Sequence, residues 1–415
     1  MRARSGPVIS YPVTVNLLPH DDAVDLDPEP VDLHGRTILQ VLPALGTGGA
    51  ERGCVDVAAA IEAAGGKALV ASAGGAMLRD LARTGADHIA LPLGGKNPLT
   101  IWRNIRRLEA VICDRGVDLV HARSRAPAWS AQAACRRAGI PFVTTVHAPY
   151  NQHSAAKRLY NSIMVRGDRV IAISDFIARH IVETYGADPA RIRTIPRGVD
   201  LRQFAIEAVS AQRIITLARA WRAPDDRPIV LMPGRLSRWK GQAVVIDALA
   251  RLGRRDLHCL IVGSDQGRTG YRKELIDRIA AKGLNGVVQL VDHCDDMPAA
   301  YMLSDVVVHA STDPEGFGRV VVEAMALGRP VIATDIGAPP ELVVEGETGW
   351  LVPPADPDAL AAAIDQALSL TPEARSRMAE QAIATVAGQY TKEAMTGATL
   401  RVYQELLGAP APSGG

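Results

Sequence analysis

Two basic residues follow an apolar run near the middle of the chain. Arg235 and Lys240 lie five residues apart in a loop that begins at Gly234, directly after the apolar run Ile229–Met232. In a parallel α/β sheet, ligands bind at the carboxyl ends of the strands. An arginine presents a planar fork to phosphate oxygens, and a lysine presents a mobile point charge. The pair indicates a phosphate site, with solvated surface charge as the alternative.

A second polar cluster follows a later apolar run. Glu315 and Glu323 are eight residues apart, and Gly316 and Gly318 precede a helix expected from about Arg319. Backbone N–H groups at such a helix start suit a diphosphate. A carboxylate at Glu323 can accept hydrogen bonds from two vicinal hydroxyls, as a ribose presents. Two carboxylates could also perform acid–base hydrolysis of a glycan, but the neighbouring cations favour a nucleotide.

A glycine-rich turn lies near the start of the chain, between the apolar run Thr37–Leu42 and a helical stretch from Ala50. Gly48 and Gly49 let a ligand approach the backbone, and the helix offers unpaired N–H groups and a positive dipole end. A dehydrogenase is disfavoured because Glu51 occupies the place of the third glycine in G-x-G-x-x-G. The alternative is a purely structural role, in which the glycines only make a tight turn.

Short apolar runs alternate with helical segments in two series, which is typical of two parallel sheets covered on both faces. The fold class predicted is therefore α/β, with two Rossmann-like doubly wound domains. The expected strands are 37–42, 68–72, 118–122, 142–146 and 169–173 in the first series, and 229–232, 259–262, 287–291, 305–309 and 330–334 in the second. The expected divisions are a loose N-terminal extension (1–35), a first domain (36–206), a second domain (207–391), and a terminal helix and tail (392–415).

Composition excludes some classes of protein. Of 415 residues, 47% are hydrophobic and 22% charged, which excludes a chain disordered throughout. No run approaches the roughly 18 apolar residues of a spanning helix, and prolines interrupt any secretory leader, so we expect a cytoplasmic protein. The net charge of +1 hides a gradient: residues 36–205 carry 23 basic and 13 acidic side chains, while residues 206–415 carry 21 and 26.

Several motifs occur together in a familiar order. They are Gly-Gly-Ala-Glu-Arg at 48–52, Asp-Arg-Val-Ile-Ala-Ile-Ser at 168–174, Ile-Pro-Arg-Gly-Val-Asp at 195–200, Gly-Arg-Leu-x3-Lys-Gly at 234–241, E-x7-E at 315–323, and Gly-Glu-Thr-Gly-Trp-Leu-Val at 346–352. Over about residues 36–405 the chain resembles glycosyltransferase family 4. The resemblance implies retaining enzymes of GT-B fold, whose two domains face each other across a cleft.

The resemblance also implies roles for the residues of the second domain. Arg235 and Lys240 would bind and neutralise the donor diphosphate, and Glu323 would hold the ribose hydroxyls. Glu315 would contact the transferred sugar and phosphates, together with the backbone at Gly316, Phe317 and Gly318.

In the first domain, the family pattern places a histidine close to the sugar at the reaction centre, and His147 matches it. A lone histidine is more often structural, so this role comes from the resemblance alone. Arg123 and Arg125 follow the preceding strand and could line the acceptor side.

The expected function is transfer of a hexosyl unit from a nucleotide-diphosphate sugar to an acceptor hydroxyl, with retention, in envelope polysaccharide, lipopolysaccharide or glycolipid synthesis. No cofactor and no metal is expected, since Asp356-Pro357-Asp358 is better interpreted as a helix start than as a metal clamp. The alternatives are a GT-B-type nucleotide-sugar epimerase and a non-catalytic sugar-nucleotide-binding protein. A P-loop kinase or ligase is disfavoured, because no G-x4-G-K-[ST] is present.

The expected partners are the nucleotide sugar and a glycan or lipid-linked acceptor, with no nucleic acid. Residues 96–107 mix basic and apolar side chains on a probable helix of the basic first domain. Such a face could rest on anionic lipid at the inner face of the membrane. The alternative is a helix that packs its apolar side into its own domain and leaves its arginines in solvent.

Overall fold

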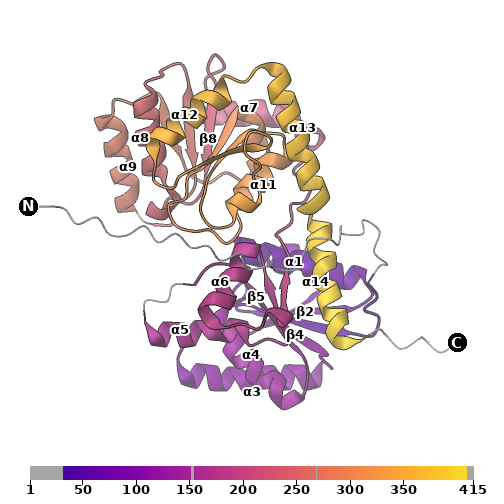
Figure 1. Ribbon diagram of the computed structural model, residues 1–415. Helices are drawn as coiled ribbons and strands as arrows, with labels where there is room; N and C mark the ends of the chain where they lie inside the picture. Colours follow the sequence, from indigo (N-terminus) through magenta and orange to yellow (C-terminus); the bar gives the residue numbers. More distant parts are fainter. Residues whose placement is uncertain (1–30, 151–153, 268, 409–415) are drawn as a thin grey trace, which may run out of the picture.

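The computed structural model describes residues 31–150, 154–267 and 269–408, which form two all-parallel sheets with helices on both faces (Figure 1). The first sheet has the order β3-β2-β1-β4-β5-β6-β7, and its strands are β1 (Thr37–Val41), β2 (Lys67–Ser72), β3 (Asp87–Ala90), β4 (Leu119–Ala122), β5 (Phe142–Val146), β6 (Arg169–Ala172) and β7 (Ile192–Thr194). The second has the order β10-β9-β8-β11-β12-β13, and its strands are β8 (Ile229–Pro233), β9 (His258–Val262), β10 (Val288–Val291), β11 (Val306–His309), β12 (Val331–Thr334) and β13 (Gly349–Val352). The predicted pair of doubly wound sheets is confirmed.

The helices divide between the sheets. Around the first sheet are α1 (Gly49–Ala63), α2 (Leu78–Ala82), α3 (Pro98–Asp114), α4 (Arg125–Ala138), α5 (Ala155–Asn161), α6 (Asp175–Tyr185) and the terminal α14 (Lys392–Leu407). Around the second are α7 (Ala211–Trp221), α8 (Gln242–Leu252), α9 (Thr269–Ala281), α10 (Met297–Leu303), α11 (Arg319–Ala326), α12 (Pro357–Leu368) and α13 (Pro372–Gln389). Within the described ranges, no helix combines the length and the apolar character needed to cross a bilayer.

Both faces of each sheet are buried, which explains why the strands are continuous apolar runs. In β1, Leu39 packs in one cluster with Leu108 of α3 and Ala131 of α4. The neighbouring Ile38 points to the opposite face, where it packs with residues of α1 and α14. Successive side chains of a strand alternate between faces, so burial on both sides requires apolar residues at every position.

Three strands were not predicted: Asp87–Ala90, Ile192–Thr194 and Gly349–Val352. All three lie at edges of the sheets. None of the residues of β3 or β7 is buried, so these strands carry no apolar run for periodicity to detect.

The chain passes between the two domains twice, and the two passages lie side by side. The N–H of Val199 donates to the carbonyl of Tyr390 (2.8 Å), and the N–H of Lys392 donates to the carbonyl of Val199 (2.8 Å). The returning helix α14 then packs on the first sheet, where the Tyr403 hydroxyl lies 2.6 Å from Nδ1 of His121. The terminal helix is therefore an integral part of the first domain's packing.

The chain ends fall largely outside the described residues. Of the predicted N-terminal extension, residues 1–30 are outside, as are residues 409–415 of the predicted tail. Leu33, which lies inside the predicted extension, is buried, and its N–H donates to the carbonyl of Ala64 (2.9 Å). The packed chain thus includes residues before Arg36.

Candidate functional site

The loops after β8 and β11 lie against each other at the carboxyl edge of the second sheet. Gly241 has φ +78°, and a Cβ there would overlap the carbonyl oxygen of Ala310. The N–H of Thr312 donates to the carbonyl of Trp239 (2.7 Å). This close approach of two backbones requires a glycine at 241, and it places Lys240 directly beside Glu315.

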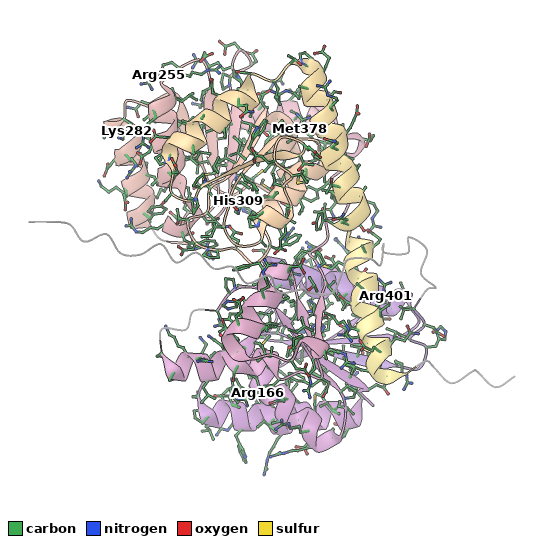
Figure 2. All side chains as sticks on the ribbon, in the orientation of Figure 1. Arg166, Arg255, Lys282, His309, Met378 and Arg401 are labelled. Atoms are coloured by element: carbon green, nitrogen blue, oxygen red, sulfur yellow. The ribbon has the colours of Figure 1, made fainter. Side chains whose placement is uncertain are left out.

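Glu315 is the centre of a buried polar cluster. Its Oε1 atom accepts hydrogen bonds from Nζ of Lys240, from Nε2 of His309 (2.8 Å) and from Oγ of Ser311. Burial alone would raise the pKa of Glu315, but His309 and Lys240 outweigh it and hold the pKa well below the usual range. Glu315 is therefore a carboxylate at neutral pH, held rigidly by three donors. His309 lies on the side of the second domain that faces the first (Figure 2).

The two predicted phosphate-binding cations are placed differently. The Nζ atom of Lys240 lies between Glu315 and the ring of Trp239, 4.5 Å from the ring centroid. Arg235 is exposed, and its Nη1 donates to Oε1 of Gln266 (3.3 Å). Arg235 is therefore free to reach a ligand from solvent, whereas Lys240 already has an anionic partner.

Helix α11 begins beside this cluster. Gly318 is its N-cap residue with φ +102°, and no side chain caps the first N–H groups. One turn later, Glu323 is buried: its Oε2 accepts from the hydroxyl of Tyr301 (2.9 Å) and its Oε1 from Nη2 of Arg319 (2.6 Å). Burial and the charge of Glu323 raise the pKa of Tyr301 well above its usual value, so the phenol remains a donor. Glu323 thus has a fixed orientation beside the open helix start.

The first domain meets the second at His147, which follows β5. A Cβ on Gly316 would lie 2.6 Å from the carbonyl oxygen of His147, and the hydroxyl of Ser174 donates to the carbonyl of Gly316 (2.8 Å). Nearby, Glu341 of the second domain accepts a hydrogen bond from the N–H of Asp175 at the start of α6 (3.0 Å). The structure therefore brings the backbone of His147 against the glycine loop that follows Glu315.

Within the described ranges, the side chain of His147 has one hydrogen-bond partner. Its Nδ1 lies 3.3 Å from Nη2 of Arg197, while its Nε2 is buried without a hydrogen-bond partner among the described residues. Burial, followed by the charges of Arg197 and Arg123, holds the pKa of His147 well below its usual value. The imidazole is therefore neutral at neutral pH.

Arg197 is a site residue that we did not predict. It follows β7, is only 8% exposed, and fits against α1 because a Cβ on Gly53 would overlap its Nη1. It also lines a small cavity between the domains, with Gly49, Arg52, Gly53, Asp56, Gly198, Arg319 and Met395. Its position in the motif Ile-Pro-Arg-Gly-Val-Asp was visible in the sequence, but its contact with His147 was not.

The two arginines predicted on the acceptor side lie in different clusters of side chains. Arg123 is buried, and its Nε donates to Oε1 of Gln40 (2.6 Å). Arg125 lies in another cluster, where its Nη1 donates to Asn161 (2.8 Å) and its guanidinium stacks on Tyr150 at 4.4 Å. Of these two arginines, Arg123 is the one that acts electrostatically on His147.

The glycine turn after β1 lies at the domain contact. Gly48 is the N-cap of α1 and provides no side-chain cap. A Cβ on Gly49 would lie 3.2 Å from Cδ of Arg319, the first residue of α11. The uncapped start of α1 therefore lies close to the start of α11.

Two other features of the sequence belong to the fold. The Oδ1 atom of Asp356 accepts from the N–H groups of Asp358 and Ala359 (both 3.0 Å), so this segment is the helix start that we predicted. Asp168 accepts a hydrogen bond from the N–H of Phe142 (2.8 Å) and joins the beginnings of β5 and β6.

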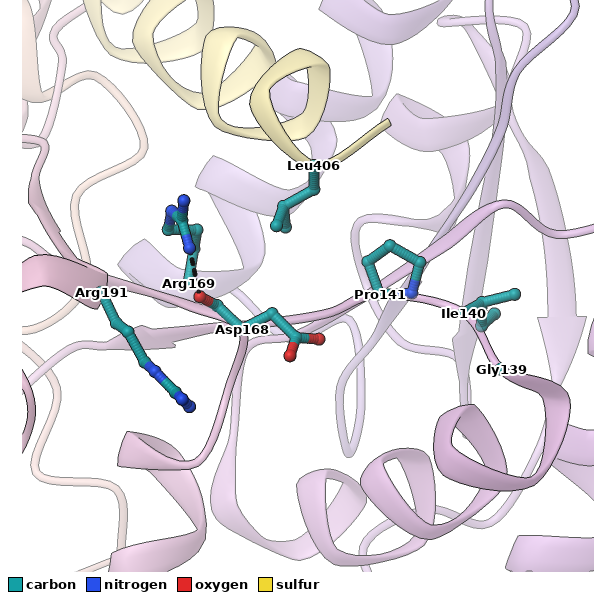
Figure 3. Close-up of a pocket in the computed structure, with 7 residues that line it drawn as sticks. All are labelled: Gly139, Ile140, Pro141, Asp168, Arg169, Arg191 and Leu406. Carbon is teal, nitrogen blue, oxygen red and sulfur yellow. Dashed lines mark hydrogen bonds between the residues drawn. The ribbon is translucent and has the colours of Figure 1, made fainter. Parts of the chain in front are cut away.

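A further cavity lies away from Glu315, Lys240 and His147. It has a volume of about 500 Å³ and is lined by Gly139, Ile140, Pro141, Asp168, Arg169, Arg191 and Leu406 (Figure 3). Pro141 and Asp168 directly precede β5 and β6, so the cavity is at the amino edge of the first sheet. Ligands of doubly wound sheets bind at the opposite edge, and we do not assign the site to this cavity.

Comparison with known proteins identifies the family. The family model described as Glycosyltransferase Family 4 matches residues 47–203, and the model described as Glycosyl transferases group 1 matches residues 214–385. The D-inositol 3-phosphate glycosyltransferase of Thermobifida fusca is 29% identical over 321 residues, which are 72% of each chain.

Solved structures show the same architecture. A glycosyltransferase from Rickettsia africae is 35% identical, with a TM-score of 0.84 over 90% of this chain and 99% of the other. The Anabaena protein HepE, crystallised with UDP and glucose, is 26% identical, with a TM-score of 0.78 over 89% of this chain and 99% of the other. The fold is GT-B, and the chain belongs to glycosyltransferase family 4.

Proposed function

We propose that this glycosyltransferase moves a hexosyl unit from a nucleotide-diphosphate sugar to an acceptor hydroxyl, with retention of the anomeric configuration. The observation that carries the proposal is the arrangement around Glu315. A fixed carboxylate, the ammonium of Lys240 and the uncapped start of α11 lie together, directly opposite His147.

Charge develops in two places when the glycosyl–phosphate bond breaks. The leaving diphosphate becomes more negative, and Lys240, Arg235 and the first N–H groups of α11 are the donors available to stabilise it. Such preorganised donors are usually the largest catalytic contribution. The sugar ring becomes more positive, and the carboxylate of Glu315 stabilises that charge. Glu323 holds the ribose hydroxyls, in place of one of its present donors.

To account for retention, we propose that the acceptor attacks the anomeric carbon from the same face from which the diphosphate departs. The bond from the anomeric carbon to the phosphate oxygen breaks, the bond to the acceptor oxygen forms, and the acceptor proton moves to the departing phosphate. This proposal is supported by the surroundings of His147: of the described side chains, those that contact it or act on its charge are Arg197, Arg123 and His121, and none of these is a carboxylate.

We further propose that UDP-sugars are the donors to test first, because HepE binds UDP and glucose. The named inositol-phosphate relatives make phosphorylated polyols reasonable soluble acceptors to include.

We also propose transfer without a metal or other cofactor, with Arg235 and Lys240 as the counter-charges. Turnover that persists in excess EDTA would support this, and turnover restored only by Mg²⁺ or Mn²⁺ would contradict it.

An acceptor in envelope glycan or glycolipid synthesis would be reached from a membrane surface, and α3 offers a face for peripheral contact. Leu99 and Trp102 are 55% and 46% exposed, beside the exposed Arg103, Arg106 and Arg107. Exposed apolar residues flanked by arginines suit an anionic bilayer. We expect the protein to float with phosphatidylglycerol vesicles, and a variant with alanine at the three arginines to remain in the lower fractions. Equal flotation of both proteins, or of neither, would contradict the contact.

The experiment that tests the function is nucleotide release from a panel of UDP-, GDP- and ADP-sugars, with and without acceptor. A transferase releases nucleotide faster with acceptor and forms a glycoside whose anomeric configuration NMR can assign. Interconversion of sugar nucleotides without acceptor would indicate an epimerase instead. Binding without any turnover would indicate a sugar-nucleotide-binding protein.

A further inference from the structure

The contact between Arg197 and His147 fixes more than the position of the imidazole. A guanidinium can only donate hydrogen bonds, and Nη2 of Arg197 lies 3.3 Å from Nδ1 of His147. The Nδ1 atom must therefore accept. In a neutral imidazole, the proton is then on Nε2.

The Nε2 atom of His147 is the ring nitrogen left without a partner in the described part of the chain. It is buried and has no hydrogen-bond partner among the described residues. His147 also lies against Gly316, in the loop between Glu315 and the start of α11. A buried N–H donor without a partner is costly, and a hydroxyl oxygen of a bound sugar could accept from it.

We propose that Arg197 is a positioning residue that holds His147 as the Nε2–H tautomer, so that His147 donates a hydrogen bond to a hydroxyl of the transferred sugar. This inference rests on the proposed function for the identity of the acceptor atom. The tautomer itself rests only on the contact between the two side chains.

The surroundings of both residues support the inference. Gly53 leaves the space for the guanidinium, because a Cβ there would overlap Nη1 of Arg197. The groups that act on the charge of His147 are Arg197, Arg123 and His121, and all three oppose a second proton. From the second domain, Gly316 lies against the backbone of His147 and Ala148. Among the described residues, the groups that act on His147 all favour the neutral imidazole, in which one ring nitrogen carries the proton.

The first arm of the test measures the tautomer without any substrate. In ¹⁵N spectra of the full-length protein, His147→Asn identifies the His147 signals by their loss. We expect an unprotonated Nδ1 and a protonated Nε2 in the wild type, and a mixture of tautomers in Arg197→Met. A proton on Nδ1 in the wild type, or an unchanged tautomer in Arg197→Met, would overturn the proposal.

The second arm measures turnover of the donor that the panel identifies. Partners that orient a histidine in metal sites are worth about 10- to 100-fold, and we expect a kcat loss of that order for Arg197→Met. Arg197→Lys should recover part of it, since the ammonium can still donate to Nδ1. Loss of the Arg197 charge should raise the pKa of His147, although burial, the larger cause of its low pKa, remains; an acidic limb of the pH profile should therefore move toward neutral pH in Arg197→Met.

Two controls separate the possible failures. Arg191→Met removes an exposed arginine six residues earlier in the chain and should leave the tautomer, kcat and pH profile unchanged. Melting temperatures show whether Arg197→Met folds, and Arg197→Lys provides a second variant if it does not. A fixed Nε2–H tautomer without glycosyl transfer by the wild type would refute the proposed function alone. Equal kcat and pH profiles in Arg197→Met and wild type would refute the positioning role.

Discussion

Replacing Lys240 by methionine tests the assignment of the donor site. Methionine keeps much of the side-chain volume but removes the charge that contacts Glu315 and lies over Trp239. Loss of one preorganised donor to a developing anion costs about 10²–10³ in turnover. We expect a loss of that size in kcat of Lys240→Met.

The same substitution should also lower stability by a calculable amount. Removing one partner of a buried ion pair costs about 3–5 kcal/mol. Here the side chains of Lys240 and Glu315 are 17% and 13% exposed. In the variant, Glu315 also retains its hydrogen bonds from His309 and Ser311. The loss should therefore be smaller, about 1–3 kcal/mol in the free energy of unfolding.

Two assays separate these effects. Urea denaturation measures stability, and nucleotide release from the active sugar nucleotide measures turnover. In the double variant with Glu315→Gln, the uncompensated carboxylate is gone, so stability should recover while turnover remains low. Lys273→Met is the matched control, because Lys273 pairs with Asp277 on the surface of α9, and its stability should change by less than about 0.5 kcal/mol. If Lys240→Met loses less than about tenfold in turnover, well short of the ~10²–10³ expected, the assignment is refuted.

Three further outcomes are expected. Gly316→Ala places a Cβ 2.6 Å from the carbonyl oxygen of His147, and it should reduce kcat by about 10²-fold with no loss of secondary structure by circular dichroism. The control is Gly388→Ala, in open space on α13, which should leave kcat unchanged. Equal activities of the two variants would contradict the domain contact. Glu323→Gln loses one acceptor and should weaken binding of the nucleoside diphosphate about tenfold in calorimetry, whereas an unchanged Kd would remove Glu323 from the ribose site. The pKa of Glu315 in the folded protein is below its unfolded value of about 4.3, so the stabilising contribution of its carboxylate is full above pH 5 and is lost as pH falls. In urea titrations between pH 7 and pH 3, the free energy of unfolding should therefore decline more steeply for the wild type than for Glu315→Gln. Parallel declines would contradict this prediction.

Much of the fold could be predicted from the chain, because buried parallel strands are local apolar runs. The strand Phe142–Val146 has the predicted bounds, and α11 begins at the predicted Arg319. Asp87–Ala90 and Ile192–Thr194 were missed, since edge strands need not be apolar. The buried Leu33 was missed because a single apolar residue among polar ones has no periodicity.

Lys240 and Glu315, which the structure brings into contact, were both named from the sequence. The residues at the carboxyl ends of β8 and β11 were named because each follows an apolar run, whereas His147 after β5 was named from the family resemblance. Their partners were not: His309 is the last residue of a strand that was correctly expected, and nothing local indicates that its ring holds Glu315. Arg123 and Arg125 were grouped as neighbours in sequence, but Arg125 is the first residue of α4 and projects to Tyr150.

The sequence by itself determined which residues lie in loops at the ends of strands, because strand and helix periodicities are local. Only the tertiary structure decided which of these residues meet. Lys240 and Glu315 are 75 positions apart, and His147 and Arg197 are 50 apart. Their contacts depend on the order of strands in each sheet and on the approach of the two domains at Gly316. These are long-range packing contacts, and they bring charged loops that are distant in the sequence together in one site.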